Sequence, residues 1–193
     1  MREGKLTKSE ATSQLIIDNY ISLMKKIDFD KITVDYLCQQ CQITRSTFYT
    51  YYRSIYDLIE SIEAQLLSTL SLKKYHTFER SAPLTVPRNA TKLWLQNCYD
   101  NKFYLISLLG EHGDPYFICK LRQSIKQGIE YEMDLDRISN DIFRPYFLQA
   151  CTYLYLNVMH HWILSDTSIS IDYVASLINA IRASSELIDY HIS

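Results

Sequence analysis

The short polar run from Thr44 to Tyr49 carries the side chains with the clearest capacity for chemistry. It combines small hydroxyl side chains with one guanidinium and one phenol: Thr44, Arg45, Ser46, Thr47 and Tyr49. Groups of these kinds donate hydrogen bonds to phosphate oxygens and to the edges of bases. If it lies on the outside of a short helix, the run could therefore contact nucleic acid.

Two short helices are predicted to position this run. Thr33 is suited to cap a helix over about 34–40. After a tight break, Thr44 is suited to cap a second helix over about 45–52. Apolar side chains at helical spacing are expected to hold the pair together: Val34, Leu37, Cys38, Ile43, Phe48 and Tyr52. The segment thus predicts a helix-turn-helix, whose second helix enters the major groove of DNA.

The same region resembles the DNA-binding part of the TetR/AcrR transcriptional regulators. The resemblance rests on three runs, which are Ile32-Thr33-Val34, the ten residues from Ile43 to Tyr52, and Tyr56-Asp57-Leu58. Members of the family typically show a T-V pair opening the second helix and a G-V-S-x-x-T-[LF]-Y-x-[HY]-F run across the turn and third helix. An S-K-x-x-L pattern then enters the fourth helix. The matched region covers about a third of the chain.

The resemblance implies that a small set of positions contacts DNA. The implied contacts are Arg45, Ser46, Thr47 and Tyr49 for bases and phosphates, with Thr33 and Tyr51 near the backbone. Thr44, as a capping residue, and Arg53 are further candidates for contact with phosphate. The resemblance also implies a homodimer, because two half-sites of a palindromic operator require two copies. A second domain is expected to hold a small-molecule effector. The expected function is that of a transcriptional regulator, acting as a repressor.

Two positions depart from the family pattern. Gln42 replaces the turn glycine, and we expect it to adopt a left-handed conformation at a cost of about 1 kcal/mol. Ile55 replaces a lysine that commonly contacts phosphate. Through Glu60 the sequence holds eight basic and eight acidic residues, so this region is neutral. DNA binding must then rest on geometry and on dimerisation and not on a basic patch.

The rest of the sequence predicts an all-α protein. Helical periodicity favours about nine helices, near residues 7–27, 34–40, 45–52, 54–70, 88–100, 102–109, 115–132, 142–164 and 172–189. Residues 73–88 break the pattern with two prolines and are interpreted as a linker. This divides the chain into a helix-turn-helix domain over 1–72 and a C-terminal helical bundle over 73–193.

The helix predicted over 142–164 is apolar nearly all round, so it is expected to be buried on more than one side. The favoured second side is the same helix of a second chain, completed by the last helix into a four-helix interface. The side chains assigned to this interface are Phe147, Cys151, Leu154, Tyr155, Val158, Trp162, Val174, Ile178 and Ile181. A thick core within one chain is the competing interpretation.

Aromatic residues of the C-terminal region are candidates to line an effector pocket. They are Trp94, Tyr99, Phe103, Tyr104, Phe117, Tyr153 and His160, with His112 near a glycine turn. The alternative is that these rings are plain core. The run from Asn101 to Phe117 also resembles a C-terminal variant seen in regulators related to dihydroxyacetone-kinase activators. That resemblance implies a protein partner in place of a metabolite.

Nothing in the sequence indicates an enzyme or a cofactor. It has no glycine-rich phosphate loop and no G-x-S-x-G elbow. His160 and His161 would point about 100° apart on a helix and could not share a metal. Cys38 and Cys41 have the spacing of zinc and redox pairs, but no second pair completes four ligands. We interpret them as packed thiols, with a metal or redox role as the alternative.

The composition favours a cytoplasmic protein. The formal net charge is −2, and five cysteines follow no disulfide framework. Polar residues interrupt the longest apolar stretch, over 146–164, so we expect no membrane span. Residues 1–12 are mostly polar and do not resemble a signal peptide. The main alternative to a regulator is a helical adaptor that acts through a protein partner without DNA.

Overall fold

The computed structural model describes residues 7–75, 89–135, 140–165 and 168–186. All regular elements in these ranges are helical, which confirms the all-α prediction. In chain order they are α1 (Lys8–Leu23), η1 (Phe29–Lys31), α2 (Val34–Cys41), α3 (Arg45–Tyr51), α4 (Ile55–Thr69), η2 (Leu72–Tyr75), α5 (Asn89–Asp100), α6 (Lys102–Leu109), α7 (Phe117–Leu135), α8 (Arg144–Leu164) and α9 (Ile171–Glu186).

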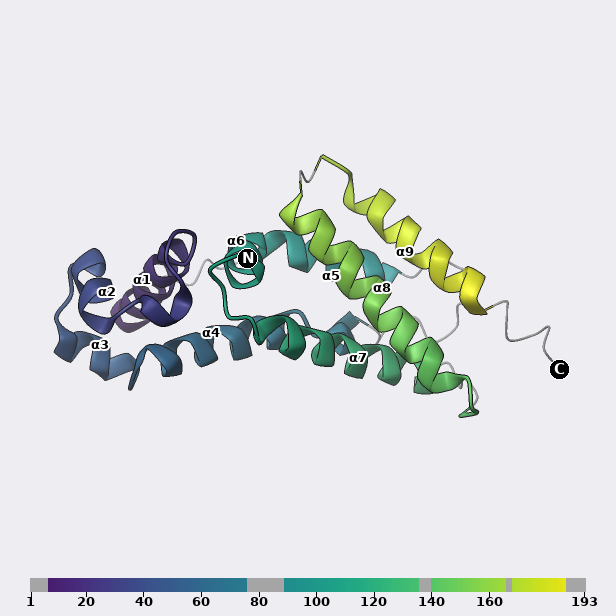
Figure 1. Ribbon diagram of the computed structural model, residues 1–193, viewed down its shortest axis with the longest axis horizontal. Coiled ribbons are helices and arrows are strands. Elements are labelled where there is room, and N and C mark those ends of the chain that lie inside the picture. Colours follow the sequence, from purple (N-terminus) through teal and green to yellow (C-terminus); the bar gives the residue numbers. More distant parts are fainter. Residues whose placement is uncertain (1–6, 76–88, 136–139, 166–167, 187–193) are drawn as a thin grey trace.

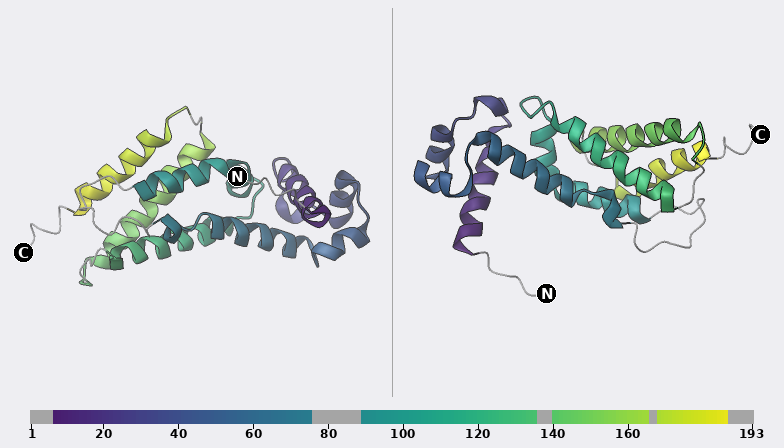
Figure 2. Two further views of the ribbon diagram at one scale, coloured as in Figure 1. Left: turned by 180° about the vertical axis from the view of Figure 1, so that it is seen from behind. Right: turned by 90° about the horizontal axis from the view of Figure 1, so that it is seen from below.

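The described helices form an elongated arrangement (Figures 1 and 2). Helices α1 to α3 gather at one end and are called the head below. Helices α5 to α9 make up the rest and are called the body. Helix α4 starts beside α3 and runs toward the body, where it packs along α7.

Side-chain caps start four helices at the predicted positions. Thr7 Oγ1 accepts the Glu10 backbone N–H at 3.2 Å, while the Glu10 carboxylate accepts the Thr7 N–H at 2.8 Å. The hydroxyls of Thr33, Thr44 and Ser54 accept backbone N–H groups at the starts of α2, α3 and α4. These caps determine where the short helices begin, and so they set the position of α3.

Several helix limits differ from the predictions by up to four residues. Helix α1 ends at Leu23 and not near residue 27, because a turn follows in which the Lys26 N–H donates to the Leu23 carbonyl at 3.0 Å. Helix α7 begins at Phe117, because Asp114 Oδ1 accepts the Tyr116 N–H at 2.8 Å in a turn before the helix. Of the predicted linker, residues 76–88 lie outside the described residues.

One continuous apolar core runs through the described molecule. It extends from Ile16 of α1 through Phe48 and Leu58 to Trp94 and Ile178. The Trp94 indole N–H donates to the Leu70 carbonyl at 2.9 Å, which fixes the end of α4 to α5. The domain boundary near residue 72 stays a prediction, because apolar packing continues across it.

Buried polar contacts position α9 on the body. Arg182 of α9 forms an ion pair with Glu132 of α7, and both side chains are almost completely buried. Thr91 Oγ1 accepts the Tyr155 hydroxyl at 2.9 Å and donates to Asn179 Oδ1 at 3.0 Å. A buried polar group is costly unless it is paired, so these contacts favour one register of α9 against α5, α7 and α8.

Candidate nucleic-acid interface

Helix α3 lies at the end of the molecule opposite α8 and α9 (Figure 1). The side chains of Arg45, Ser46 and Tyr49 are exposed, whereas Phe48 is completely buried. Tyr49 keeps 55% of its surface exposed. The face of α3 that the sequence predicts to contact DNA is therefore directed to solvent, and the opposite face anchors the helix.

Thr44 and Thr47 contact each other at the start of α3. Thr44 Oγ1 accepts the Thr47 N–H at 3.1 Å, and the two hydroxyl oxygens lie 2.9 Å apart. These hydroxyls therefore serve the cap in the free protein. The Thr50 hydroxyl likewise donates to the Ser46 carbonyl at 3.0 Å. The exposed side chain of Ser46 is the hydroxyl of this turn that is best placed for an outside partner.

Arg45 forms an ion pair with Asp35 of α2. Both side chains are exposed, by 65% for Arg45 and 49% for Asp35. The hydrogen bond that Arg45 donates to the Asp35 carboxylate raises the pKa of the Arg45 guanidinium, which therefore stays charged. Asp35 was not predicted as part of the site. The sequence could have indicated this pair, because Asp35 and Arg45 are the two charged residues between positions 34 and 52 and carry opposite charges.

The tyrosines of this region differ in how they face the core. Tyr52 is buried, and its hydroxyl lies 2.8 Å from Ser13 Oγ of α1. Tyr51 is half-buried, with its ring centre 6.5 Å from that of Tyr52. Tyr49 is the exposed one, and the edge of its ring packs against Phe48. Tyr51 is thus less accessible than the resemblance implies.

The remaining predicted contacts flank α3. Thr33 Oγ1 accepts the Tyr36 N–H at 3.3 Å, and Thr33 is exposed at the start of α2. Arg53 is exposed between α3 and α4, where its backbone N–H donates to Asp57 Oδ2 at 2.8 Å. Tyr36 and Tyr56 are exposed phenols on α2 and α4 that were not predicted, by 39% and 61%. The sequence gives little indication that these two tyrosines belong to the site, because tyrosine is common throughout the chain.

Gln42 makes the turn between α2 and α3. It has φ 54° and ψ 41°, which confirms the expected left-handed conformation. The next residue, Ile43, donates its N–H to the Cys38 carbonyl at 3.0 Å and closes the end of α2. Most residues other than glycine resist this conformation, so the turn holds local strain that glycine would relieve.

Cys38 and Cys41 are both buried in the head. Burial raises the pKa of both thiols, that of Cys41 to about 11, so both remain protonated at neutral pH. A metal ligand or redox nucleophile needs the thiolate, and these values favour the interpretation as packed thiols. Within the described ranges, no three His, Cys, Asp or Glu side chains are grouped to hold a metal ion.

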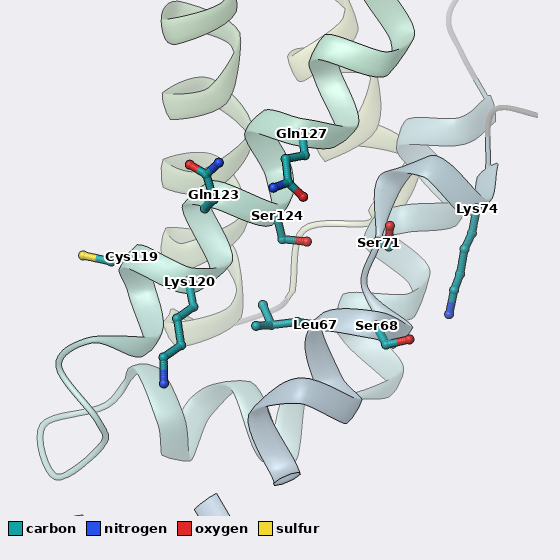
Figure 3. Close-up of a pocket in the computed structure, with 9 residues that line it drawn as sticks. All are labelled: Leu67, Ser68, Ser71, Lys74, Cys119, Lys120, Gln123, Ser124 and Gln127. Carbon is teal, nitrogen blue, oxygen red and sulfur yellow. The ribbon is translucent and has the colours of Figure 1, made fainter. Parts of the chain in front are cut away.

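The aromatic residues predicted to line an effector pocket lie at different depths within the described ranges. Trp94 and Phe117 are fully buried, Tyr99, Phe103 and His160 are half-buried, and Tyr153 is exposed. A groove between α4 and α7 is lined by none of them (Figure 3), and Tyr104 lines a smaller pocket of about 140 Å³ between α1, α4 and α6. His112 instead pairs with Asp28, 2.7 Å from its carboxylate. The aromatic pocket stays a prediction, because aromatic spacing does not distinguish a core from a cavity.

Several residues assigned to the dimer interface are inside a single chain. The buried ones are Cys151, Tyr155, Trp162, Val174 and Ile178, which keep little surface for a second copy. Helix α8 packs against α5, α6, α7 and α9 of its own chain, so the part of these residues in a dimer stays a prediction. Phe147, Leu154 and Val158 are half-buried, and Ile181 is 44% exposed.

No helix in the described ranges, α8 included, has the length and apolar character needed to cross a membrane.

Comparison with solved structures identifies the fold. A TetR transcriptional regulator from Streptococcus agalactiae 2603V matches with a TM-score of 0.65 and 19% identity, over 91% of this chain and 95% of that chain. A TetR-like transcriptional regulator from Rhodococcus sp. RHA1 matches with a TM-score of 0.68 and 16% identity, over 95% and 99%. The dihydroxyacetone kinase operon activator DhaS matches with a TM-score of 0.61 and 16% identity, over 92% and 97%. No family model and no curated protein matches the sequence. The chain has the fold of TetR-type regulators, as the motif resemblance predicts.

Proposed function

We propose that this chain is a DNA-binding transcriptional regulator whose recognition helix is α3. The observation that carries the proposal is the exposed start of α3, where Arg45, Ser46 and Tyr49 face solvent beside a buried Phe48. A helix held in this way can enter the major groove with its N-terminal residues against base edges. Thr33 and Arg53 are proposed to contact the backbone from either side. A regulator of this kind acts where the chromosome is, in the cytoplasm of a bacterium.

A mobility-shift assay on the promoter region of the chain's own gene tests this proposal. Arg45→Ala should weaken binding by about 5- to 150-fold, the loss expected for a bidentate contact to guanine. Tyr49→Phe should have a smaller effect, because it removes one hydroxyl. Arg122→Ala is the matched control, since Arg122 lies in the body and bonds the Tyr153 hydroxyl. Equal binding by the wild type and the Arg45 variant would exclude α3 as the recognition helix.

We also propose a homodimer formed by the outer faces of α8 and α9. Tyr173, Leu177 and Ile181 recur every four residues on α9 and are 64%, 42% and 44% exposed. Such an apolar stripe favours burial against a second copy. Two heads would then contact half-sites about 34–36 Å apart.

Light scattering after gel filtration tests the dimer. Leu177→Glu should dissociate it, whereas Leu15→Glu on α1 should not, although Leu15 is equally exposed at 43%. A wild-type mass of 22.7 kDa at micromolar concentration would contradict the dimer. Loss of specific DNA binding in the Leu177 variant would show that both heads are needed.

Whether a bound regulator represses or activates a gene depends on where its operator lies relative to the promoter. We propose that this chain represses. DhaS is named as an activator, so activation with a protein partner is the second candidate. A reporter gene behind the bound promoter distinguishes the two, because deletion of the regulator raises expression in one case and lowers it in the other. A chain that binds no DNA would favour an adaptor.

A further inference from the structure

The helix-turn-helix from Ile32 to Tyr52 contains two charged residues, and they pair with each other. Asp35 lies in the first turn of α2 and Arg45 is the first residue of α3. Arg45 Nη2 donates to Asp35 Oδ2. Because the two charges cancel, this part of the head has no net attraction for phosphate. How Asp35 holds Arg45 therefore bears directly on what the cation can recognise.

Both members of the pair extend from fixed points of the backbone. Asp35 follows the Thr33 cap by two residues, and Arg45 follows the Thr44 cap directly. The completely buried ring of Phe48 anchors α3. An arginine side chain is long, so holding it in one direction costs conformational entropy. A carboxylate at a fixed place removes part of that cost before DNA arrives.

The pair leaves the guanidinium able to contact a base. The side chains of Arg45 and Asp35 keep 65% and 49% of their surfaces exposed. A guanidinium has five N–H donors, whereas the contact with Asp35 is made through Nη2. The remaining donors suffice for the O6 and N7 acceptors of a guanine edge. Pairing with Asp35 and reading a guanine are thus compatible.

A DNA phosphate meets the same pair under less favourable conditions. Its negative charge approaches a guanidinium that Asp35 already neutralises, and the carboxylate repels it. Binding to DNA of any sequence depends on such phosphate contacts, whereas base contacts carry the specificity. The pair therefore disfavours the contact that every duplex offers and permits the one that a particular sequence offers.

We propose that Asp35 is a positioning residue, which directs Arg45 toward a guanine edge and weakens binding to DNA of the wrong sequence. The proposal rests on the proposed DNA-binding function and adds to it a source of specificity. Its measure is the ratio of two affinities, one for the promoter fragment and one for an unrelated duplex. Both are measured over a range of salt concentrations.

Asp35→Asn removes the charge and keeps an oxygen that can accept from Arg45. The variant should bind the unrelated duplex more tightly, by up to about tenfold, because one more phosphate can be contacted. Its plot of log affinity against log salt concentration should be steeper by about 0.9, the value for one phosphate. The ratio of specific to non-specific affinity should fall by about threefold or more.

Two further variants separate the direction of Arg45 from the charge of its partner. Asp35→Ala removes the acceptor as well, so it should bind the promoter fragment about two- to tenfold more weakly than Asp35→Asn, the cost of ordering one long side chain. Asp35→Glu keeps the carboxylate and should recover most of the wild-type ratio. Circular dichroism verifies that each variant is folded.

A double-mutant cycle tests whether Asp35 acts through Arg45. In chains that carry Arg45→Ala, the additional change Asp35→Asn should alter the ratio by less than about twofold. A fall as large as that in the wild-type background would show that Asp35 acts on DNA by itself, and would overturn the positioning role. Asp30→Asn is the control for charge, since Asp30 is exposed in η1 of the same head.

The outcomes separate this proposal from the proposed function. A wild-type chain that binds no duplex, or binds every duplex equally, refutes both. A wild-type chain that discriminates, together with an Asp35→Asn variant that discriminates equally well, refutes the role of Asp35 alone. An equal fall of the ratio in Asp30→Asn would assign the effect to net charge and would also overturn that role.

Discussion

The head and the body use ion pairs in opposite ways. In the head, Asp35 and Arg45 meet on the surface, where water screens them and a partner can reach them. In the body, Glu132 and Arg182 meet in the interior, where each depends on the other for solvation. The head therefore keeps its charges accessible to a partner, whereas the body uses charge to fix how its helices pack.

Removing one member of each pair should give the largest contrast. Arg182→Met leaves the Glu132 carboxylate buried without its guanidinium and should lower the free energy of unfolding by about 3–5 kcal/mol. Asp35→Asn should leave that free energy unchanged within error, because many exposed pairs contribute nothing measurable. Urea unfolding followed by circular dichroism measures both.

The double variant Glu132→Gln, Arg182→Met is the control for the buried pair. It should recover much of the lost stability, because no uncompensated charge remains inside. If Arg182→Met alone costs no more than Asp35→Asn, the pair does not fix α9 and the contrast between head and body fails.

Close packing gives a second, smaller contrast. Gly128→Ala would force η2 away from α7, since the new Cβ would lie 2.5 Å from Leu72 Cβ. Strain of about 1–3 kcal/mol opposes a gain of about 1 kcal/mol in helix propensity. We therefore expect a net loss of about 1 kcal/mol in unfolding experiments. A gain in stability would show that η2 yields easily and that the body is not tightly joined there.

The pH dependence of Glu63 probes the junction between the two regions. Burial raises the pKa of the Glu63 carboxyl above its ordinary value of 4.5, and Lys120 offsets this only in part. The protonated form is therefore favoured in the folded state, so Glu63 destabilises the fold increasingly as the pH rises above 4.5 through its folded pKa. Glu63→Gln removes this pH-dependent destabilisation, because glutamine does not ionise.

The expected result is a relative one. The stability of Glu63→Gln minus that of the wild type should increase from pH 4.5 to pH 8, as measured by urea unfolding at each pH. A constant difference would mean that the Lys120 contact cancels the burial of Glu63 entirely. Glu60→Gln, one turn away and exposed, serves as the control.

The sequence predicts the head far better than the body. Caps at Thr33 and Thr44 and the left-handed turn at Gln42 are local, because each depends on residues three or four positions away. The exposed start of α3 follows from these local signals. The pair between Arg45 and Asp35 does not, because it joins two helices across the turn.

In the body, the apolar pattern predicts the helices but not their neighbours. Tyr155 and Trp162 belong to the interior, although their spacing on α8 is equally compatible with a contact between chains. The groove beside Ser124 is invisible in the sequence, because it arises from two contacts that hold α7 and α4 together at their ends. Contacts between residues far apart in the sequence determine both the burial of α8 and the presence of the groove.

The turn at Gln42 gives the smallest and most local test of the comparison. Gln42→Gly should stabilise the chain by less than about 1 kcal/mol, because relief of the left-handed strain is partly offset by the entropy of glycine in the unfolded state. Since the change leaves the Thr44 cap and the anchor at Phe48 intact, DNA affinity should stay within about twofold. Thermal unfolding and a mobility shift on the promoter fragment measure the two quantities. Gln42→Ala, which keeps the strain but removes the amide, is the matched control. If glycine weakened DNA binding strongly while alanine did not, the strained turn itself would be positioning α3, and the head could no longer be regarded as set by its caps alone.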